Sequence, residues 1–192
     1  LNNEYPRIAQ RAKAENGEIQ WGDETGMRSD SHAGRSYAPI GETPVRLVSG
    51  SRFSTNMIST VTNRGKLRFM LYRETLTAPV LIRFLSRLIR DAQGRKVFLI
   101  LDNLRVHHSK KVSAWVGDRK EQIELFFLPA YAPELNPDEY LNCDLKHQVR
   151  TGLPARNQDE LERRVRSVMR RLQLHPERIR SYFRHPRIAY AA

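Results

Sequence analysis

The chain has 192 residues, a length that favours one domain with a sizeable hydrophobic core. Its 33 Lys+Arg against 21 Asp+Glu give a formal net charge of +12, which favours a polyanionic partner, most often nucleic acid. No apolar run approaches the ~18 residues that a membrane-spanning helix needs, and a single cysteine excludes an internal disulfide. We therefore expect an intracellular protein that binds nucleic acid and has no membrane partner.

The chain begins with a polar lead-in segment, residues 1–17, in which residues 6–14 are predicted to form a short helix. Residues 18–24 then alternate between apolar and polar side chains, which predicts a strand. Asp23 shares a face with the apolar side chains at the end of this strand, whereas Glu24 points to the opposite face. The alternative for Asp23 is a turn residue ahead of Thr-Gly.

A loop and a hairpin are predicted next. Residues 26–50 are rich in Gly, Ser, Pro and Arg, and they read as a loop with one small hairpin of residues 36–38 against 45–48. Residues 56–62 and 66–72 are β-rich runs joined by Asn-Arg-Gly, a strong hairpin turn.

A helix and a buried strand follow. Thr77 is predicted to cap an amphipathic helix, and Gly94 is predicted to lie just beyond the end of that helix. Residues 97–101 are five consecutive apolar residues, as expected for a central strand buried on both faces. Asp102 ends this run, where a carboxylate either binds a ligand at the sheet edge or caps the next segment. His107 follows closely and is either a catalytic group or a structural loop residue.

The second half of the chain is predicted to alternate again between helix and strand. Ser109 caps a helix, residues 123–128 form an apolar strand, and Asn136 begins a helix that runs to about Arg150 with two acids in its first turn. Asn157 begins a last long helix with a capping-box pattern. Strands alternating with helices in this way indicate an α/β fold, a mixed sheet flanked by helices on both faces.

Three carboxylates stand where these elements end or begin: Asp23 and Asp102 at the ends of two strands, and Glu139 at the start of a helix. If they converge, their oxygen atoms are suitable ligands for Mg²⁺ or Mn²⁺. Two such ions activate an attacking oxygen and stabilise the leaving oxygen in phosphoryl transfer. Asp138, next to Glu139, is the rival third ligand, although an acid in the first turn is also explained by the helix dipole.

Three motifs resemble the DDE transposases of bacterial insertion sequences in the Tc/mariner superfamily: Trp21-Gly22-Asp23-Glu24-Thr25-Gly26, Leu101-Asp102-Asn103, and Leu128-Pro129-Ala130-Tyr131-Ala132-Pro133-Glu134-Leu135-Asn136-Pro137-Asp138-Glu139. The last is the most specific, and the resemblance covers residues 18–150. It implies an RNase H-like fold whose metal-binding catalytic triad is Asp23, Asp102 and Glu139. Thirty-six residues separate the second and third acids, near the family's spacing.

The resemblance also implies the reaction and the partners. It implies DNA strand cleavage and strand transfer with two Mg²⁺ or Mn²⁺ ions, acting on transposon ends and target DNA, in a homodimer in the active complex. The location would be bacterial cytoplasm, in association with the nucleoid. The family carries helix-turn-helix domains ahead of the catalytic domain, and the 22 residues before Asp23 are too few for one. We therefore expect one catalytic domain over residues 1–192, and a catalytically inactive DNA-binding or regulatory remnant is the alternative.

Basic residues are concentrated toward the C-terminus. From Lys146 onward there are twelve Lys+Arg against four Asp+Glu, and residues 175–192 are expected to be a basic tail on the surface. Lys146 and Arg150 fall within about 20° of Glu139 on the helical wheel. The expected contacts to the DNA backbone are those of Lys146, Arg150, Arg163, Arg164 and Arg166. The alternative is a solvated helix face.

Overall fold

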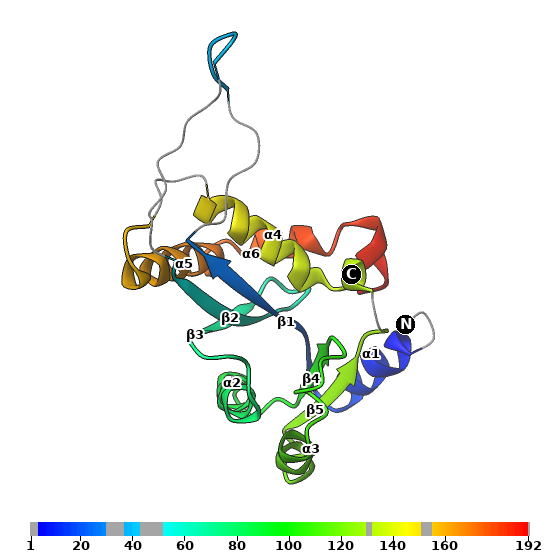
Figure 1. Cartoon of the computed structure of the whole chain (residues 1–192). Helices are drawn as coiled ribbons and strands as arrows, with labels where there is room; N and C mark the ends of the chain where they lie inside the picture. Colours follow the sequence, from blue (N-terminus) through cyan, green and yellow to red (C-terminus); the bar gives the residue numbers. More distant parts are fainter. Residues whose placement is uncertain (1–3, 30–36, 43–51, 130–131, 151–154, 192) are drawn as a thin grey trace.

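The computed structural model describes residues 4–29, 37–42, 52–129, 132–150 and 155–191 (Figure 1). Its five strands are β1 (Glu18–Arg28), β2 (Ser54–Val61), β3 (Leu67–Tyr72), β4 (Val97–Leu101) and β5 (Ile123–Phe127). Its helices are α1 (Tyr5–Ala14), α2 (Ala78–Asp91), α3 (Lys110–Gly117), α4 (Pro137–Arg150), α5 (Gln158–Gln173) and α6 (Pro176–Tyr182), with the short 3₁₀ helices η1 (Pro133–Leu135) and η2 (Pro186–Ala191).

One mixed sheet contains all five strands in the order β3-β2-β1-β4-β5 (Figure 1). The central strand β1 pairs antiparallel with β2 and parallel with β4, and β4 pairs parallel with β5. Helices α4, α5 and α6 pack on one face of the sheet, and α2 and α3 pack on the other. The expected mixed sheet with helices on both faces is confirmed.

The prediction that the first strand ends at Asp23 is wrong. β1 continues to Arg28, because β2 pairs with it along its whole outer half. The parallel pairing with β4, by contrast, stops at Trp21, opposite Ile100. Asp23 therefore lies in the middle of a strand, two residues beyond the point where β4 ends its pairing.

The predicted hairpin of β2 and β3 is confirmed, and its turn is held from outside. Gly65 has φ +87°, and a Cβ on it would lie 2.5 Å from the carbonyl oxygen of Pro176. A larger residue here would strain the backbone and displace the start of α6. The small hairpin predicted for residues 36–38 and 45–48 falls outside the described residues.

The predicted helix starts at Ser109 and Asn157 are confirmed, whereas Thr77 stands at the N-cap position of α2 without a side-chain cap hydrogen bond. The Ser109 side chain accepts a hydrogen bond from the Val112 amide, and Asn157 Oδ1 accepts one from the Glu160 amide at 2.8 Å. Both are N-caps that satisfy an otherwise unpaired amide of the first turn. Within the described residues, none of the helices has the length and apolar character needed to cross a membrane.

The C-terminal segment is more than the surface tail that its composition predicts. It forms α6 and η2, and its apolar side chains belong to the same core as β1 and α4. The ring of Phe183 packs edge-on against that of Trp21, with centroids 5.0 Å apart. On α4, Asp144 accepts two hydrogen bonds from Arg178, at 2.8 and 2.9 Å. The segment therefore completes the core on this side of the sheet.

Candidate active site

The start of α4 is tied to the strand that carries Asp23. The Asn136 side chain accepts a hydrogen bond from the Asp138 amide at 3.1 Å, which is how it begins the helix. The same side chain donates through Nδ2 to the carbonyl oxygen of Gly22 at 3.0 Å. One asparagine thus sets both where α4 begins and how it sits beside β1.

A cleft of about 440 Å³ opens at this junction. Its lining includes all three carboxylates of the predicted triad: Asp23 from β1, Asp102 just after β4, and Glu139 in the first turn of α4. The remaining lining comes from the loops after β4 and β5 and from η1. Three acids that are far apart in the sequence therefore share one cavity, as the sequence predicts.

The charges of these acids affect one another. Asp23 is 9% exposed, and burial, followed by the charge of Glu139 and then that of Asp102, raises its pKa to about 7. The Glu24 backbone amide opposes this rise but does not cancel it. Such mutual repulsion is typical of carboxylates grouped around a cation site. Within the described residues, however, no three carboxylate, imidazole or thiol groups stand close enough together to hold a metal ion.

Asp138, the rival ligand, does not line this cleft. Its side chain is fully buried and accepts a hydrogen bond from the Ser59 hydroxyl at 2.7 Å. Burial raises the pKa of Asp138 well above its usual range, and the charge of Asp23 raises it further. The arrangement favours Glu139 over Asp138 as the third ligand.

The side chain of His107 packs against Asp102. Its buried ring places Nδ1 3.0 Å from the Asp102 carbonyl oxygen and 3.1 Å from Asp102 Oδ1. Burial alone would lower the pKa of His107, but the hydrogen bonds and the charge of Asp102 outweigh burial and raise it. The imidazole of His107 therefore contacts Asp102, one of the predicted metal ligands, so His107 is next to the candidate site and is not an ordinary loop residue.

Sequence reasoning missed Asn142, which donates through Nδ2 to Asp23 Oδ2 at 2.9 Å. The residue is fully buried on α4 between the apolar positions Leu141 and Leu145. A polar residue inside an apolar helical stripe is the signal that could have identified it.

The predicted DNA-binding residues lie on two helices. Lys146 and Arg150 are half-buried on α4, whereas Arg163 and Arg166 are exposed on α5. Arg164 pairs with Glu160 at 3.2 Å, so part of its charge is already neutralised. Contact of these five residues with DNA stays a prediction.

Comparison with known proteins gives both a family and a fold. Residues 18–162 match the family described as DDE superfamily endonucleases. The structure of a pre-cleavage Mos1 transpososome aligns with a TM-score of 0.67 and 17% identity, covering 100% of this chain and 61% of that one. The catalytic domain of Mos1 mariner transposase aligns with a TM-score of 0.62 and 15% identity, covering 98% of this chain and 90% of that one. The structure of the same domain with Raltegravir and Mg aligns with a TM-score of 0.61 and 15% identity, covering 100% of this chain and 93% of that one.

No curated protein matches the chain. The chain spans about three fifths of the Mos1 transposase chains in the transpososome, so it corresponds to part of that protein. The structural likeness shows that its mixed sheet is the RNase H-like fold of a transposase catalytic domain. Because the family match covers most of its length, the chain belongs to the DDE endonuclease superfamily.

Proposed function

We propose that this chain is the catalytic domain of a transposase that cleaves and joins DNA strands, with Asp23, Asp102 and Glu139 as its metal-binding triad. The observation that carries the proposal is the presence of all three carboxylates in one cleft, where they repel one another. A cluster of acids at the centre of a protein with a net charge of +12 is otherwise unexplained. The fold and the family support the same reading.

The donor set fits Mg²⁺ or Mn²⁺, because hard divalent cations prefer carboxylate oxygens. Structures of Mos1 transposase were solved with Mn and with Mg. Two such ions would activate the attacking oxygen and stabilise the leaving oxygen of the scissile phosphodiester. Asp23, Asp102 and Glu139 would supply the negative charge that holds them. Because uncompensated carboxylates repel one another, these side chains would stand apart until a cation neutralises them.

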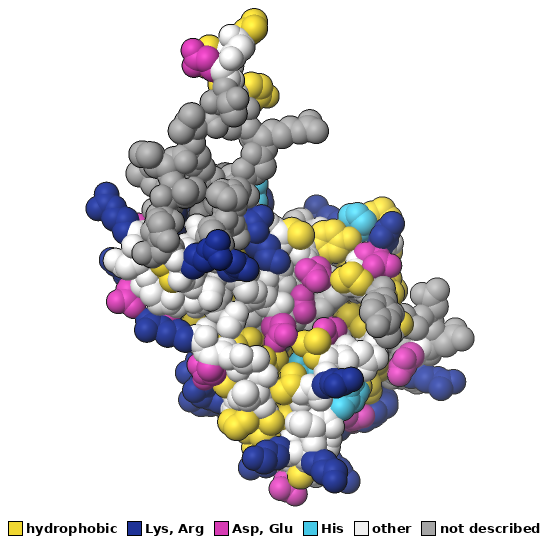
Figure 2. Space-filling model, viewed as in Figure 1, with side chains coloured by type: hydrophobic (Ala, Val, Ile, Leu, Met, Phe, Trp, Pro, Cys, Tyr) yellow, Lys and Arg dark blue, Asp and Glu magenta, His cyan; other side chains and the backbone are white. Residues whose placement is uncertain are grey.

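The proposed partners are transposon ends and target DNA, bound by a homodimer. Mos1 transposase forms a paired-end complex. Figure 2 shows acidic side chains near the middle of one face and Lys and Arg side chains around its edge, an arrangement that suits a phosphate backbone crossing an acidic centre. We also propose an origin in a bacterial insertion sequence and a cytoplasmic, nucleoid-associated location.

A metal titration tests the site. Adding Mn²⁺ is expected to raise the melting temperature of the wild-type protein, because binding to the folded state relieves the repulsion. Asp23→Asn is expected to lose that response and, at pH 8, to raise the metal-free melting temperature by a few degrees. Asp118→Asn, which changes an exposed carboxylate just after the end of α3, is the matched control. A wild-type protein that neither responds to Mn²⁺ nor cuts labelled DNA would instead favour the inactive remnant.

The basic face of α4 gives a separate prediction. Lys146→Ala and Arg150→Ala are each expected to weaken DNA binding and to reduce the slope of log affinity against log salt by about one, while Mn²⁺ binding stays intact. Binding titrations at several salt concentrations measure both quantities. Unchanged affinity and slope in the double variant would return the two residues to an ordinary solvated face.

A further inference from the structure

Two buried asparagines, Asn136 immediately before α4 and Asn142 within it, hold two consecutive residues of β1. Asn136 donates to the Gly22 carbonyl at 3.0 Å, and Asn142 donates to the Asp23 carboxylate at 2.9 Å. Their side chains are 2% and 1% exposed. Six positions along the helix separate these contacts, so they fix α4 against β1 at two points on either side of Glu139.

Asn142 belongs to a buried polar cluster under the cleft. One helical turn earlier, Asp138 accepts from Ser59, which lies directly opposite Asp23 in the pairing of β1 with β2. Within the described residues, Asp138 Oδ1 and Asn142 Oδ1 are both buried and lack a hydrogen-bond partner. Unsatisfied buried oxygens cost free energy, so stability alone does not explain this cluster.

We propose that Asn142 is a positioning residue for Asp23, an inference that rests on the proposed function. Its amide donates to Asp23 Oδ2 and so holds in one orientation a carboxylate that lines the cleft. A neutral donor does this without adding negative charge beside Asp23 and Glu139, which a carboxylate would. Residues that orient metal ligands in this way typically change metal affinity by 10–100-fold when replaced.

The closing experiment measures Mn²⁺ affinity from the electron paramagnetic resonance signal of free Mn²⁺, alongside metal-free unfolding. Asn142→Leu keeps a similar volume and removes the donor, and it is expected to weaken Mn²⁺ binding about tenfold or more. Asn142→Asp is expected to weaken it further at pH 8, because it adds a buried like charge. Gln20→Leu is the matched control, since Gln20 is a fully buried amide on β1 that bonds Glu18 and Thr60, away from the cleft. That control is expected to lower stability but to leave Mn²⁺ affinity within about twofold.

Each outcome bears on a different claim. Wild-type Mn²⁺ affinity in Asn142→Leu, or an equal loss of affinity in Gln20→Leu, overturns the positioning role. If Asn142→Leu does not fold, Asn142→Ser tests the same claim, because serine is too short to reach Asp23; unchanged affinity in that variant overturns it. Mn²⁺ binding by the wild-type protein is measured first. If the wild-type protein does not bind Mn²⁺, the proposed function itself is overturned.

Discussion

Replacing Asp102 with asparagine is expected to lower Mn²⁺-dependent DNA cleavage by about 10³-fold, while leaving the fold intact. The substitution keeps the size of the side chain but removes one of the three charges in the cleft. A ligand's share of transition-state stabilisation by a metal is several kcal/mol, and about 4 kcal/mol corresponds to a factor of 10³. Cleavage of end-labelled DNA under single-turnover conditions measures the change.

Asp118→Asn again serves as the control, because it removes the same charge from an exposed position just after α3. It is expected to cleave at the wild-type rate. A rate for Asp102→Asn within about tenfold of wild type would remove Asp102 from the catalytic site. Circular dichroism and the metal-free melting temperature show whether the variant still folds, which separates loss of chemistry from loss of structure.

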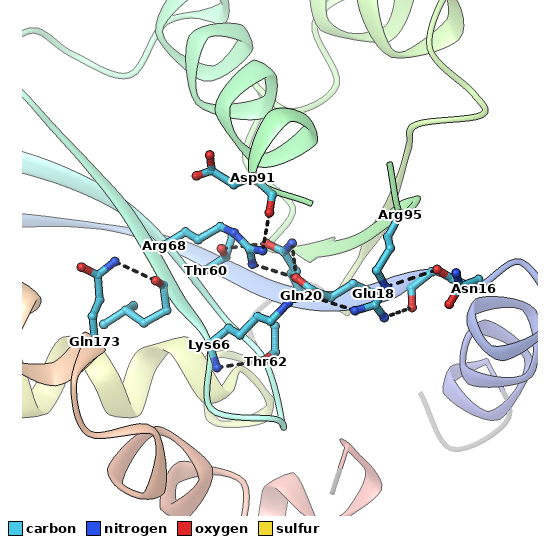
Figure 3. Close-up of polar contacts among 12 residues, drawn as sticks. Asn16, Glu18, Gln20, Thr60, Thr62, Lys66, Arg68, Asp91, Arg95 and Gln173 are labelled. Atoms are coloured by element: carbon cyan, nitrogen blue, oxygen red, sulfur yellow. Dashed lines mark hydrogen bonds and ion pairs between the residues drawn. The ribbon is translucent and has the colours of Figure 1, made fainter. Parts of the chain in front are cut away.

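The second large effect is expected at Glu18, a carboxylate that joins several elements at the start of β1 (Figure 3). The side chain is 4% exposed and accepts from Lys66 at 2.5 Å, Arg68 at 2.7 Å and Arg95 at 3.2 Å. Glu18→Gln leaves these cations without a counter-charge and is expected to destabilise the protein by about 3 kcal/mol at pH 7. Urea denaturation of the two proteins measures this difference in the free energy of unfolding. Glu15→Gln, which breaks a more exposed ion pair with Lys96, is expected to destabilise the protein less than Glu18→Gln does.

The loss of stability in Glu18→Gln is expected to be smaller at low pH. Burial alone would raise the pKa of Glu18, but its hydrogen bonds and the charges of Lys66 and Arg68 outweigh burial and lower it. A carboxylate whose folded pKa is lowered contributes stability above its unfolded pKa of about 4.3, and that contribution is lost as pH falls through the folded value. The difference between wild type and Glu18→Gln is therefore expected to shrink below about pH 4. A difference that is constant from pH 7 to pH 3 would contradict the charge-based account.

The elements were predictable where one local pattern decides them. The five apolar residues of β4, the caps Ser109 and Asn157, and the turn at Gly65 all depend on a few neighbouring side chains. The length of β1 was not predictable, because its outer half is set by pairing with β2 and not by its own alternation.

Some residues of the candidate site could likewise be predicted from local sequence, and others could not. Asp102 and Glu139 were identifiable because each stands at the end or the start of an element. Asn142 left only the weaker signal of a polar residue in an apolar helical stripe, because whether such a side chain faces the core depends on what packs against the helix. The contact between His107 and Asp102 likewise depends on how the loop after β4 turns back.

The change of pairing partner along β1 has a consequence for the order in which the candidate site assembles. β2 follows β1 after 25 residues, whereas 68 residues separate the end of β1 from the start of β4, so the parallel pairing of β1 with β4 closes the longer loop. Asp23 lies in the part of β1 that pairs with β2 alone, whereas Asp102 and Glu139 reach it only once β4 and α4 have docked. A partly folded chain therefore holds one acid of the three, and capacity to bind a divalent cation would report that folding is complete.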